Sequence, residues 1–299
     1  MWFGTIHGAK WAAGLAYYFR DVRRYPRGVT LPFCGDVMSE LLRVETVGRV
    51  ARVTLYRADL HNAFNEVMIA EITAAFVEFG RREDVRVVVL AGEGKSFCAG
   101  ADVNWMKRMV DFTFEQNAED ANLLARMLRV IRECPKPVIA RVHGAALGGG
   151  VGLTAACDIA VAVESVVFCL SEVKLGIVPA VISPFVMEKI GAGQMRRYGL
   201  TAERFSAAEA KRIGLVHEVF PTIEAMDARI AEIGKTLMSN GPHAIAAAKR
   251  ILSEVAGVPW NQVQARTVET ISRLRVSPEG QEGLKAFLEK RKPGWVTDT

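Results

Sequence analysis

Three short segments of the chain carry residue types that could stabilise negative charge and transfer a proton. They read CAGAD at 98–102, GAALGGG at 144–150 and SEVKLGIVPA at 171–180. Glycine and alanine allow a backbone amide to approach a ligand closely, because no large side chain intervenes. Glu172, in the third segment, could act as an acid or a base near neutral pH if burial raises its pKa.

The two segments rich in glycine and alanine each lie between an expected strand and an expected helix. Segment 98–102 follows the β-branched run 85–90, and segment 144–150 follows the apolar run 138–142. Free backbone N–H groups near a helix start point toward negative charge. Two of them directed at one oxygen would form an oxyanion hole that stabilises an enolate. Either segment alone is also typical of an ordinary turn, and neither has the spacing of a P-loop or a dinucleotide-binding fingerprint.

The third segment offers a single acidic group. Glu172 is expected to end the apolar strand that contains residues 166–170, where an unpaired carboxylate is costly to bury. One interpretation is therefore an acid/base residue. The other is a structural glutamate that pairs with Lys174 or a nearby arginine.

The elements around these segments predict an α/β fold. Residues 43–46 and 50–56 alternate around Gly48, which predicts a β-hairpin. Apolar side chains at helical spacing predict a helix over 65–82. Further strands are expected at 85–90, 138–142, 159–163, 166–170 and 216–219, and further helices at 103–110, 123–131, 181–190, 193–199, 206–212, 222–239, 242–254, 259–275 and 279–290. Strand–strand–helix units followed by a helical tail are typical of α/β architecture.

Three regions divide the chain. Residues 1–37 show no sustained period and are expected to form a poorly structured extension, residues 38–240 a core domain, and residues 241–299 a helical C-terminal region. Half of the 299 residues are hydrophobic, which is enough for a substantial core. No apolar run reaches the ~20 residues needed to cross a bilayer, so no membrane partner is expected.

The cysteines and charges narrow the possible functions. The five cysteines are odd in number and lack metal-ligand spacing, which favours reduced thiols in a cytoplasmic protein and no metal site. The net charge is +5, and the basic residues are scattered. They form either a solvated surface or a site for an anionic ligand.

Together the three segments resemble the crotonase superfamily of enoyl-CoA hydratases and isomerases. Arg57 and the pair Asn62-Ala63 come first, followed by CAGAD, GAALGGG and SEVKLGIVPA, in the order and at the spacing of that family. Residues 282–291 look like its closing helix. The resemblance extends from Leu41 to Trp295.

This resemblance implies a crotonase fold, a spiral of ββα units with a helical C-terminal trimerisation region, and a homotrimer or a dimer of trimers. The N–H groups of Ala101 and Gly149 would bind the thioester oxygen of an acyl-CoA, and Glu172 would be the acid/base. Coenzyme A would be part of the substrate, and no separate cofactor is expected. The residues implied in substrate or coenzyme A binding are Arg57, Ala58, Leu60, Ala99, Ala101, Asp102, Val103, Asn104, Arg108, Gly148, Gly149, Phe287 and Lys290.

One position departs from the family members that use two glutamates, because Gly152 stands where the first acid would be. The single-glutamate pattern, with NWMKRM at 104–109 and SEVKLGIVPAVISP at 171–184, is similar to one subgroup. That subgroup contains bacterial hydratases of 3-methylglutaconyl-CoA and isohexenylglutaconyl-CoA, which act in leucine and acyclic terpenoid breakdown. Both substrates carry a distal carboxylate. Lys107 and Arg108 are candidate partners for it, and a solvent-facing role is the alternative.

Three classes of function follow. The first is a hydratase, in which Glu172 takes a proton from water and returns one to Cα. The second is an isomerase or thioesterase that uses the same oxyanion hole. The third is a non-catalytic protein that binds acyl-CoA or nucleic acid. The chain lacks an RNA-binding motif or a basic stripe, so nucleic acid is not an expected partner.

Overall fold

Residues 37–296 are described by the computed structural model of the chain. They belong to one compact unit, Phe33–Thr299. The predicted extension at 1–37 lies outside the described residues except for its last residue, Val37, which begins the first strand. The predicted boundary between 240 and 241 falls between two helices and stays a prediction.

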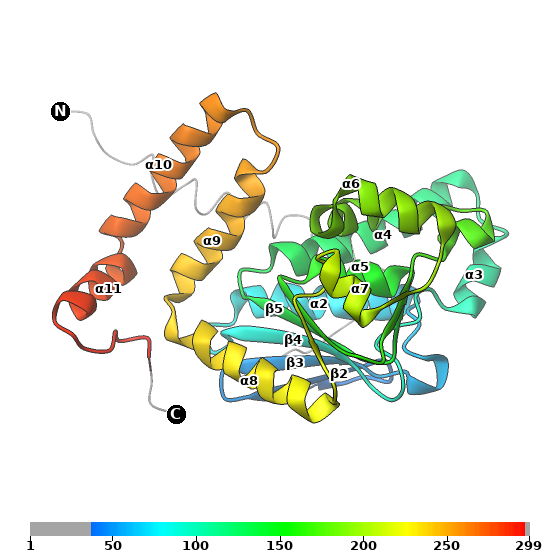
Figure 1. Cartoon of the computed structure of the whole chain (residues 1–299), viewed down its shortest axis with the longest axis horizontal. Coiled ribbons are helices and arrows are strands. Elements are labelled where there is room, and N and C mark those ends of the chain that lie inside the picture. Colours follow the sequence, from blue (N-terminus) through cyan, green and yellow to red (C-terminus); the bar gives the residue numbers. More distant parts are fainter. Residues whose placement is uncertain (1–36, 297–299) are drawn as a thin grey trace. The chain divides into compact units, whose positions relative to one another are not determined.

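This unit contains a seven-stranded sheet with the strand order β1-β2-β3-β4-β5-β7-β10. Its strands β2, β3, β4 and β5 lie side by side in Figure 1. The first three strands are antiparallel, and the strands from β3 to β10 are parallel. β4 and β5 are buried at every residue, as expected for a parallel sheet covered on both faces. The strand bounds are β1 Val37–Met38, β2 Leu42–Val47, β3 Val50–Leu55, β4 Val87–Gly92, β5 Val138–Val142, β7 Ile159–Val163 and β10 Glu218–Phe220.

The predicted hairpin is confirmed. Val47 pairs with Val50, so Gly48 and Arg49 form a two-residue turn between β2 and β3. The φ angle of Gly48 is 58°, a left-handed conformation that glycine adopts without steric cost.

A second, three-stranded sheet brings two of the chemically interesting segments together. It consists of β6 (Ala145–Leu147), β8 (Val167–Cys169) and β9 (Phe205–Ser206). β6 and β8 are parallel, and Leu147 pairs with Cys169. The glycine-rich loop after β6 therefore begins beside the segment that leads to Glu172.

Ten α-helices occur in the described residues, and they cover the sheet and form the C-terminal region (Figure 1). α8 packs against β4, β5 and β7, whereas α2 packs against α4, and α9, α10 and α11 pack on one another. The bounds are α2 Glu66–Arg81, α3 Val103–Met109, α4 Phe114–Glu133, α5 Gly149–Ala156, α6 Ser183–Thr201, α7 Ala207–Arg212, α8 Ile223–Ser239, α9 Pro242–Val255, α10 Trp260–Val276 and α11 Pro278–Leu288.

Several element boundaries differ from the predictions. The helix expected at 123–131 begins earlier, at Phe114, because Thr113 and Gln116 form a capping box there. The two helices expected at 181–190 and 193–199 form one element, α6, which is kinked where Gly191 has a φ of 72°. Glu172 does not end a strand. The strand stops at Cys169, and Glu172 opens the 3-10 turn η3 (Glu172–Leu175).

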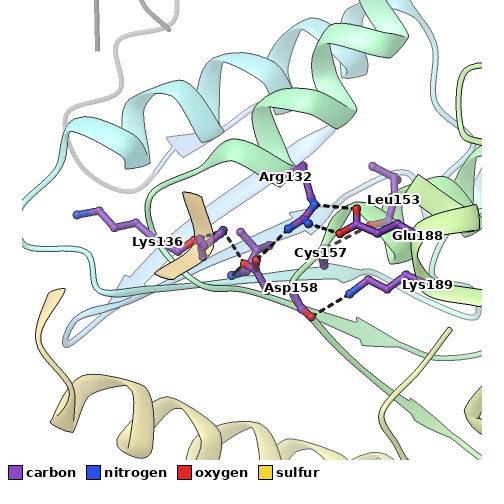
Figure 2. Close-up of polar contacts among 9 residues, drawn as sticks. Arg132, Lys136, Leu153, Cys157, Asp158, Glu188 and Lys189 are labelled. Atoms are coloured by element: carbon purple, nitrogen blue, oxygen red, sulfur yellow. Dashed lines mark hydrogen bonds and ion pairs between the residues drawn. The ribbon is translucent and has the colours of Figure 1, made fainter. Parts of the chain in front are cut away.

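A half-buried charged network centred on Asp158 joins distant elements (Figure 2). The Asp158 carboxylate accepts hydrogen bonds from the N–H of Val138 (2.7 Å) and from Nζ of Lys249 (2.6 Å), and Arg132 lies 3.8 Å away. Nζ of Lys189 donates to the Asp158 carbonyl oxygen at 3.0 Å. Because Lys249 belongs to α9, this network attaches the C-terminal helices to β5, α4 and α6.

Within residues 37–296, no helix is long and apolar enough to span a membrane, and no cluster of histidine, cysteine and acidic side chains could hold a metal ion. The cysteines in that part of the chain, Cys98, Cys134, Cys157 and Cys169, are buried free thiols.

Candidate active site

The first loop leaves the amide of Ala101 free. Phe64 forms a parallel bridge with Ala101. The N–H of Phe64 donates to the Gly100 oxygen at 2.8 Å, and the carbonyl of Phe64 accepts from the N–H of Asp102 at 3.0 Å. The Ala101 N–H lies between these bonds and has no acceptor among the described residues. A polar group of this kind requires water or a ligand.

The second loop leaves the amide of Gly149 free. The N–H of Gly148 donates to the Cys169 oxygen at 2.8 Å, which ties the loop to β8. Gly149 is the first residue of α5, and a helix has no internal partner for its first N–H groups. None of the residues in the described part of the chain accepts a hydrogen bond from Gly149.

The two loops lie against each other at this point. Cys98 and Ala146 form a parallel bridge, and the N–H of Leu147 donates to the Cys98 oxygen at 3.0 Å. A Cβ atom added to Gly100, the neighbour of Ala101, would lie 3.5 Å from the Gly149 nitrogen. The structure therefore brings the two free amides into the same small region, as an oxyanion hole requires.

Steric contacts explain why this region needs glycine. A Cβ atom on Gly149 would lie 2.2 Å from Cζ of Phe64, and one on Gly150 would lie 2.3 Å from the Cys98 oxygen. Carbon atoms in proteins pack at about 3.5–4.0 Å, so neither position accepts a larger residue without movement. Phe64 itself is buried and contacts the ring of Trp105, with 6.1 Å between ring centroids.

Glu172 lies beside the second loop. Its Oε1 is 3.3 Å from the place where a Cβ atom on Gly148 would stand. Its Oε2 is buried and has no hydrogen-bond partner among the described residues. Burial raises the pKa of the Glu172 carboxyl above its ordinary value. An ion pair with Lys174 or an arginine, the structural alternative, is not observed for Glu172 within residues 37–296.

The place for a second carboxylate is filled by an apolar side chain. A Cβ atom on Gly152 would lie 2.4 Å from Cγ2 of Ile182, which is 3% exposed. A glutamate at this position could not be accommodated without displacing Ile182. Glu172 is the only acidic side chain among the groups nearest to a Cβ atom placed on Gly148, Gly149, Gly150 or Gly152.

Arg57 supports the first loop through a nearly buried ion pair. Its Nη1 lies 2.6 Å from Oδ2 of Asp102 and donates to the Ala63 oxygen at 3.0 Å. Asp102 also caps α3, because its Oδ1 accepts from the N–H of Asn104 (2.6 Å) and of Trp105 (3.0 Å). Burial raises the pKa of Asp102, but these amide hydrogen bonds and Arg57 together hold it below its ordinary value.

Asn62 fixes the turn that carries Arg57. It is fully buried, its Oδ1 accepts from the N–H of Arg57 at 2.9 Å, and its Nδ2 donates to the oxygens of Glu93 (2.8 Å) and Ser96 (2.7 Å). The segment around Arg57 is therefore attached to the segment that leads into the first loop. The sequence motif contained Asn62, but this positioning role was not predicted.

The other predicted binding residues lie in different environments. Ala99 donates its N–H to the His61 oxygen at 2.9 Å. Phe287 is 81% exposed and Lys290 is also exposed, at the end of α11, which packs against α9 and α10. Their contacts with coenzyme A stay a prediction. Four further predicted binding residues are exposed. Ala58 and Leu60 lie on η2 (Ala58–Leu60), and Val103 and Asn104 lie at the start of α3.

Arg108 has a partner within the chain. Its Nη2 lies 2.5 Å from Oε1 of Glu66, and both side chains are about half exposed. Trp105 is buried and donates from Nε1 to Oδ1 of Asp120 at 3.1 Å. Burial raises the pKa of Asp120, the Trp105 hydrogen bond lowers it, and the nearby Glu66 raises it, with an upward net shift.

Residues 45–298 match the family model described as "Enoyl-CoA hydratase/isomerase", so the chain belongs to the enoyl-CoA hydratase/isomerase family. It is 32% identical to the human "Delta(3,5)-Delta(2,4)-dienoyl-CoA isomerase, mitochondrial", with 85% of this chain and 84% of that protein covered. It is also 35% identical over 195 residues to "Enoyl-CoA hydratase ACTT6" of Alternaria alternata, but covers only 63% of its length.

Solved structures agree with this assignment. An enoyl-CoA hydratase from Shewanella pealeana is 46% identical, with a TM-score of 0.82 and coverage of 85% of this chain and 96% of that one. Pseudomonas aeruginosa AtuE is 35% identical, with a TM-score of 0.83 and coverage of 86% and 100%. The predicted crotonase-type α/β fold is confirmed.

Proposed function

We propose that the protein is an enoyl-CoA hydratase, a lyase that adds water to the double bond of an α,β-unsaturated acyl-CoA. One observation carries the proposal: the free amides of Ala101 and Gly149 lie together, and the partly buried carboxylate of Glu172 lies beside the loop of Gly149. The amides would bind the thioester oxygen. The carboxylate would then face Cα and Cβ, the two carbon atoms that follow the thioester carbonyl.

The reaction uses these groups in sequence. The two amides polarise the thioester carbonyl and stabilise the enolate that forms when water adds at Cβ. Ionised Glu172 accepts a proton from the attacking water and then returns a proton to Cα. With Gly152 and Ile182 at the second acidic position, one carboxylate performs both transfers.

Isomerisation is the competing activity, because relatives include dienoyl-CoA isomerases and because one carboxylate is also sufficient to move a double bond. Product analysis separates the two activities. Hydration removes the conjugated thioester and adds the mass of water, whereas isomerisation changes only the position of the double bond. An isomeric product without a hydrated one would reject the hydratase proposal. Thioester hydrolysis would be recognised by free coenzyme A.

The proposed acyl group is a branched glutaconyl chain, as in 3-methylglutaconyl-CoA or isohexenylglutaconyl-CoA. The similarity of 104–109 and 171–184 to the subgroup that uses these substrates supports it. Arg108 would bind the distal carboxylate in place of Glu66, with which it now pairs. The test compares steady-state hydration of both thioesters and of crotonyl-CoA by the wild type and by Arg108→Ala. An unchanged preference in the variant would reject the role of Arg108.

We also propose that the chain assembles into a homotrimer or a dimer of trimers in the cytoplasm. Free thiols at the four described cysteines support a reducing compartment. Large apolar side chains exposed on α9, α10 and α11 support self-association. These side chains are Leu252, Trp260, Val268, Ile271, Val276, Leu284, Phe287 and Leu288. Light scattering of the purified protein tests the assembly, and a monomer at micromolar concentration would reject it.

A further inference from the structure

Ser171 presents a second polar side chain at the loop of Gly149. Its Oγ lies 3.7 Å from the place where a Cβ atom on Gly148 would stand, and Oε1 of Glu172 lies 3.3 Å from that same place. The hydroxyl and the carboxylate thus converge on one point beside the proposed oxyanion hole. Both side chains are only partly accessible to solvent.

The Ser171 hydroxyl has no structural use in the described part of the chain. It does not cap η3, although Ser171 is the residue before that turn. Its carbonyl oxygen accepts from the N–H of Lys174, but its Oγ forms no hydrogen bond with any described residue. Other serines of the chain do use their hydroxyls in this way, since Ser206 and Ser277 cap α7 and α11.

The attacking water has no second carboxylate to bind it near Gly152, and the Ser171 hydroxyl could bind it instead. A water molecule that attacks Cβ must be held in place as well as deprotonated, so each of its two hydrogens needs an acceptor, and Glu172 takes one of them. Ile182 fills the space where a second acid would stand. A hydroxyl oxygen can accept a hydrogen bond, so Oγ of Ser171 suits the water hydrogen that is not bound to Glu172.

We infer that Ser171 is a further catalytic residue, whose hydroxyl binds the attacking water together with Glu172. This inference rests on the proposed hydratase function. In the step, the water oxygen forms a bond to Cβ, and the π electrons of the double bond move to the thioester oxygen held by Ala101 and Gly149. Glu172 takes one proton of the water, and the other hydrogen is donated to Oγ of Ser171. Return of the proton from Glu172 to Cα restores the thioester carbonyl.

The test compares Ser171→Ala and Ser171→Thr with the wild type in hydration of crotonyl-CoA, 3-methylglutaconyl-CoA and isohexenylglutaconyl-CoA. Loss of one hydrogen bond to the water should lower kcat of the alanine variant about tenfold and change KM less than about twofold. The threonine variant keeps the hydroxyl and should retain more activity than the alanine variant. The matched control is Ser165→Ala, in the exposed turn between β7 and β8, which should match the wild type.

The outcomes separate this inference from the proposed function. A wild-type enzyme that hydrates none of the three thioesters overturns both. A wild-type hydratase whose kcat is unchanged in Ser171→Ala overturns the role of Ser171 alone. Equal losses in the alanine and threonine variants, or a loss confined to KM, also overturn it, because those results indicate packing or substrate binding rather than a hydroxyl bound to water.

Discussion

Replacement of Gly152 by alanine should destabilise the protein, even though alanine favours helices more than glycine does. Gly152 lies inside α5, and the added Cβ atom would stand 2.4 Å from Cγ2 and 2.9 Å from Cβ of Ile182. Both distances are well below the ~3.5–4.0 Å at which carbon atoms pack. Overpacking of this kind costs about 1–3 kcal/mol, which equals or exceeds the ~1 kcal/mol gained from helix propensity.

Gly234 provides a matched control for this substitution. It lies inside α8, and no atom outside that helix's local backbone lies within 4 Å of a Cβ atom placed on it. Gly234→Ala should therefore show the propensity gain of ~1 kcal/mol without the overlap. The difference between the two variants isolates the contact with Ile182.

The assay is urea unfolding at one fixed chain concentration, with Ile182→Ala added to the wild type and to Gly152→Ala. Ile182→Ala alone should cost about 2–5 kcal/mol, because it leaves a cavity. It should cost less in the Gly152→Ala background, by ~1 kcal/mol or more, since it removes the overlapping Cγ2 atom. Additive effects, or a Gly152→Ala variant as stable as Gly234→Ala, would refute the claim that Ile182 occupies the place of a second carboxylate.

Three further predictions concern charged groups. Glu172→Gln should lower kcat by about 10²- to 10⁴-fold with little change in KM. Because burial raises the pKa of Glu172 and hydration needs its ionised form, wild-type kcat should fall as the pH drops through that raised pKa, and a flat profile would contradict this role. The side chain in Asp102→Asn can still cap α3, but Arg57 loses its carboxylate partner. Urea unfolding should therefore show a loss of ~3 kcal/mol. An unchanged stability would show that the Arg57–Asp102 ion pair is unimportant. In urea unfolding, Asp158→Asn should destabilise the protein by ~3 kcal/mol. The control Glu203→Gln removes an exposed ion pair with Arg197 and should cost less than ~1 kcal/mol. Equal losses of stability in the two variants would contradict the structural role of the Asp158 network.

Local signals in the sequence were sufficient to predict much of the fold and the positions of the loops at 98–102 and 144–150. The β2–β3 hairpin follows from a glycine between two alternating runs, and the buried strand β4 follows from its β-branched residues. The loops at 98–102 and 144–150 were predicted from their small residues and from their position between an expected strand and an expected helix. The structure shows the same residues in contact, with both amides free.

Interactions between distant segments could not be predicted in this way. Ile182 fills the space beside Gly152 because α5 and α6 pack together, and nothing in either segment specifies that contact. Lys249 and Asp158 are 91 residues apart, so their ion pair depends on how α9 lies against the core. The convergence of Ser171 with Glu172 on Gly148 likewise depends on the pairing of β6 with β8.

The vibrational frequency of the thioester carbonyl in a bound substrate tests the oxyanion hole directly. Raman spectra of crotonyl-CoA labelled with ¹³C at the carbonyl, bound to Glu172→Gln so that turnover is slowed, report the polarisation of that bond. Two amides that donate to the oxygen should shift the stretch to a lower frequency than in water. A bound thioester with the same frequency as in water would contradict the assignment of Ala101 and Gly149.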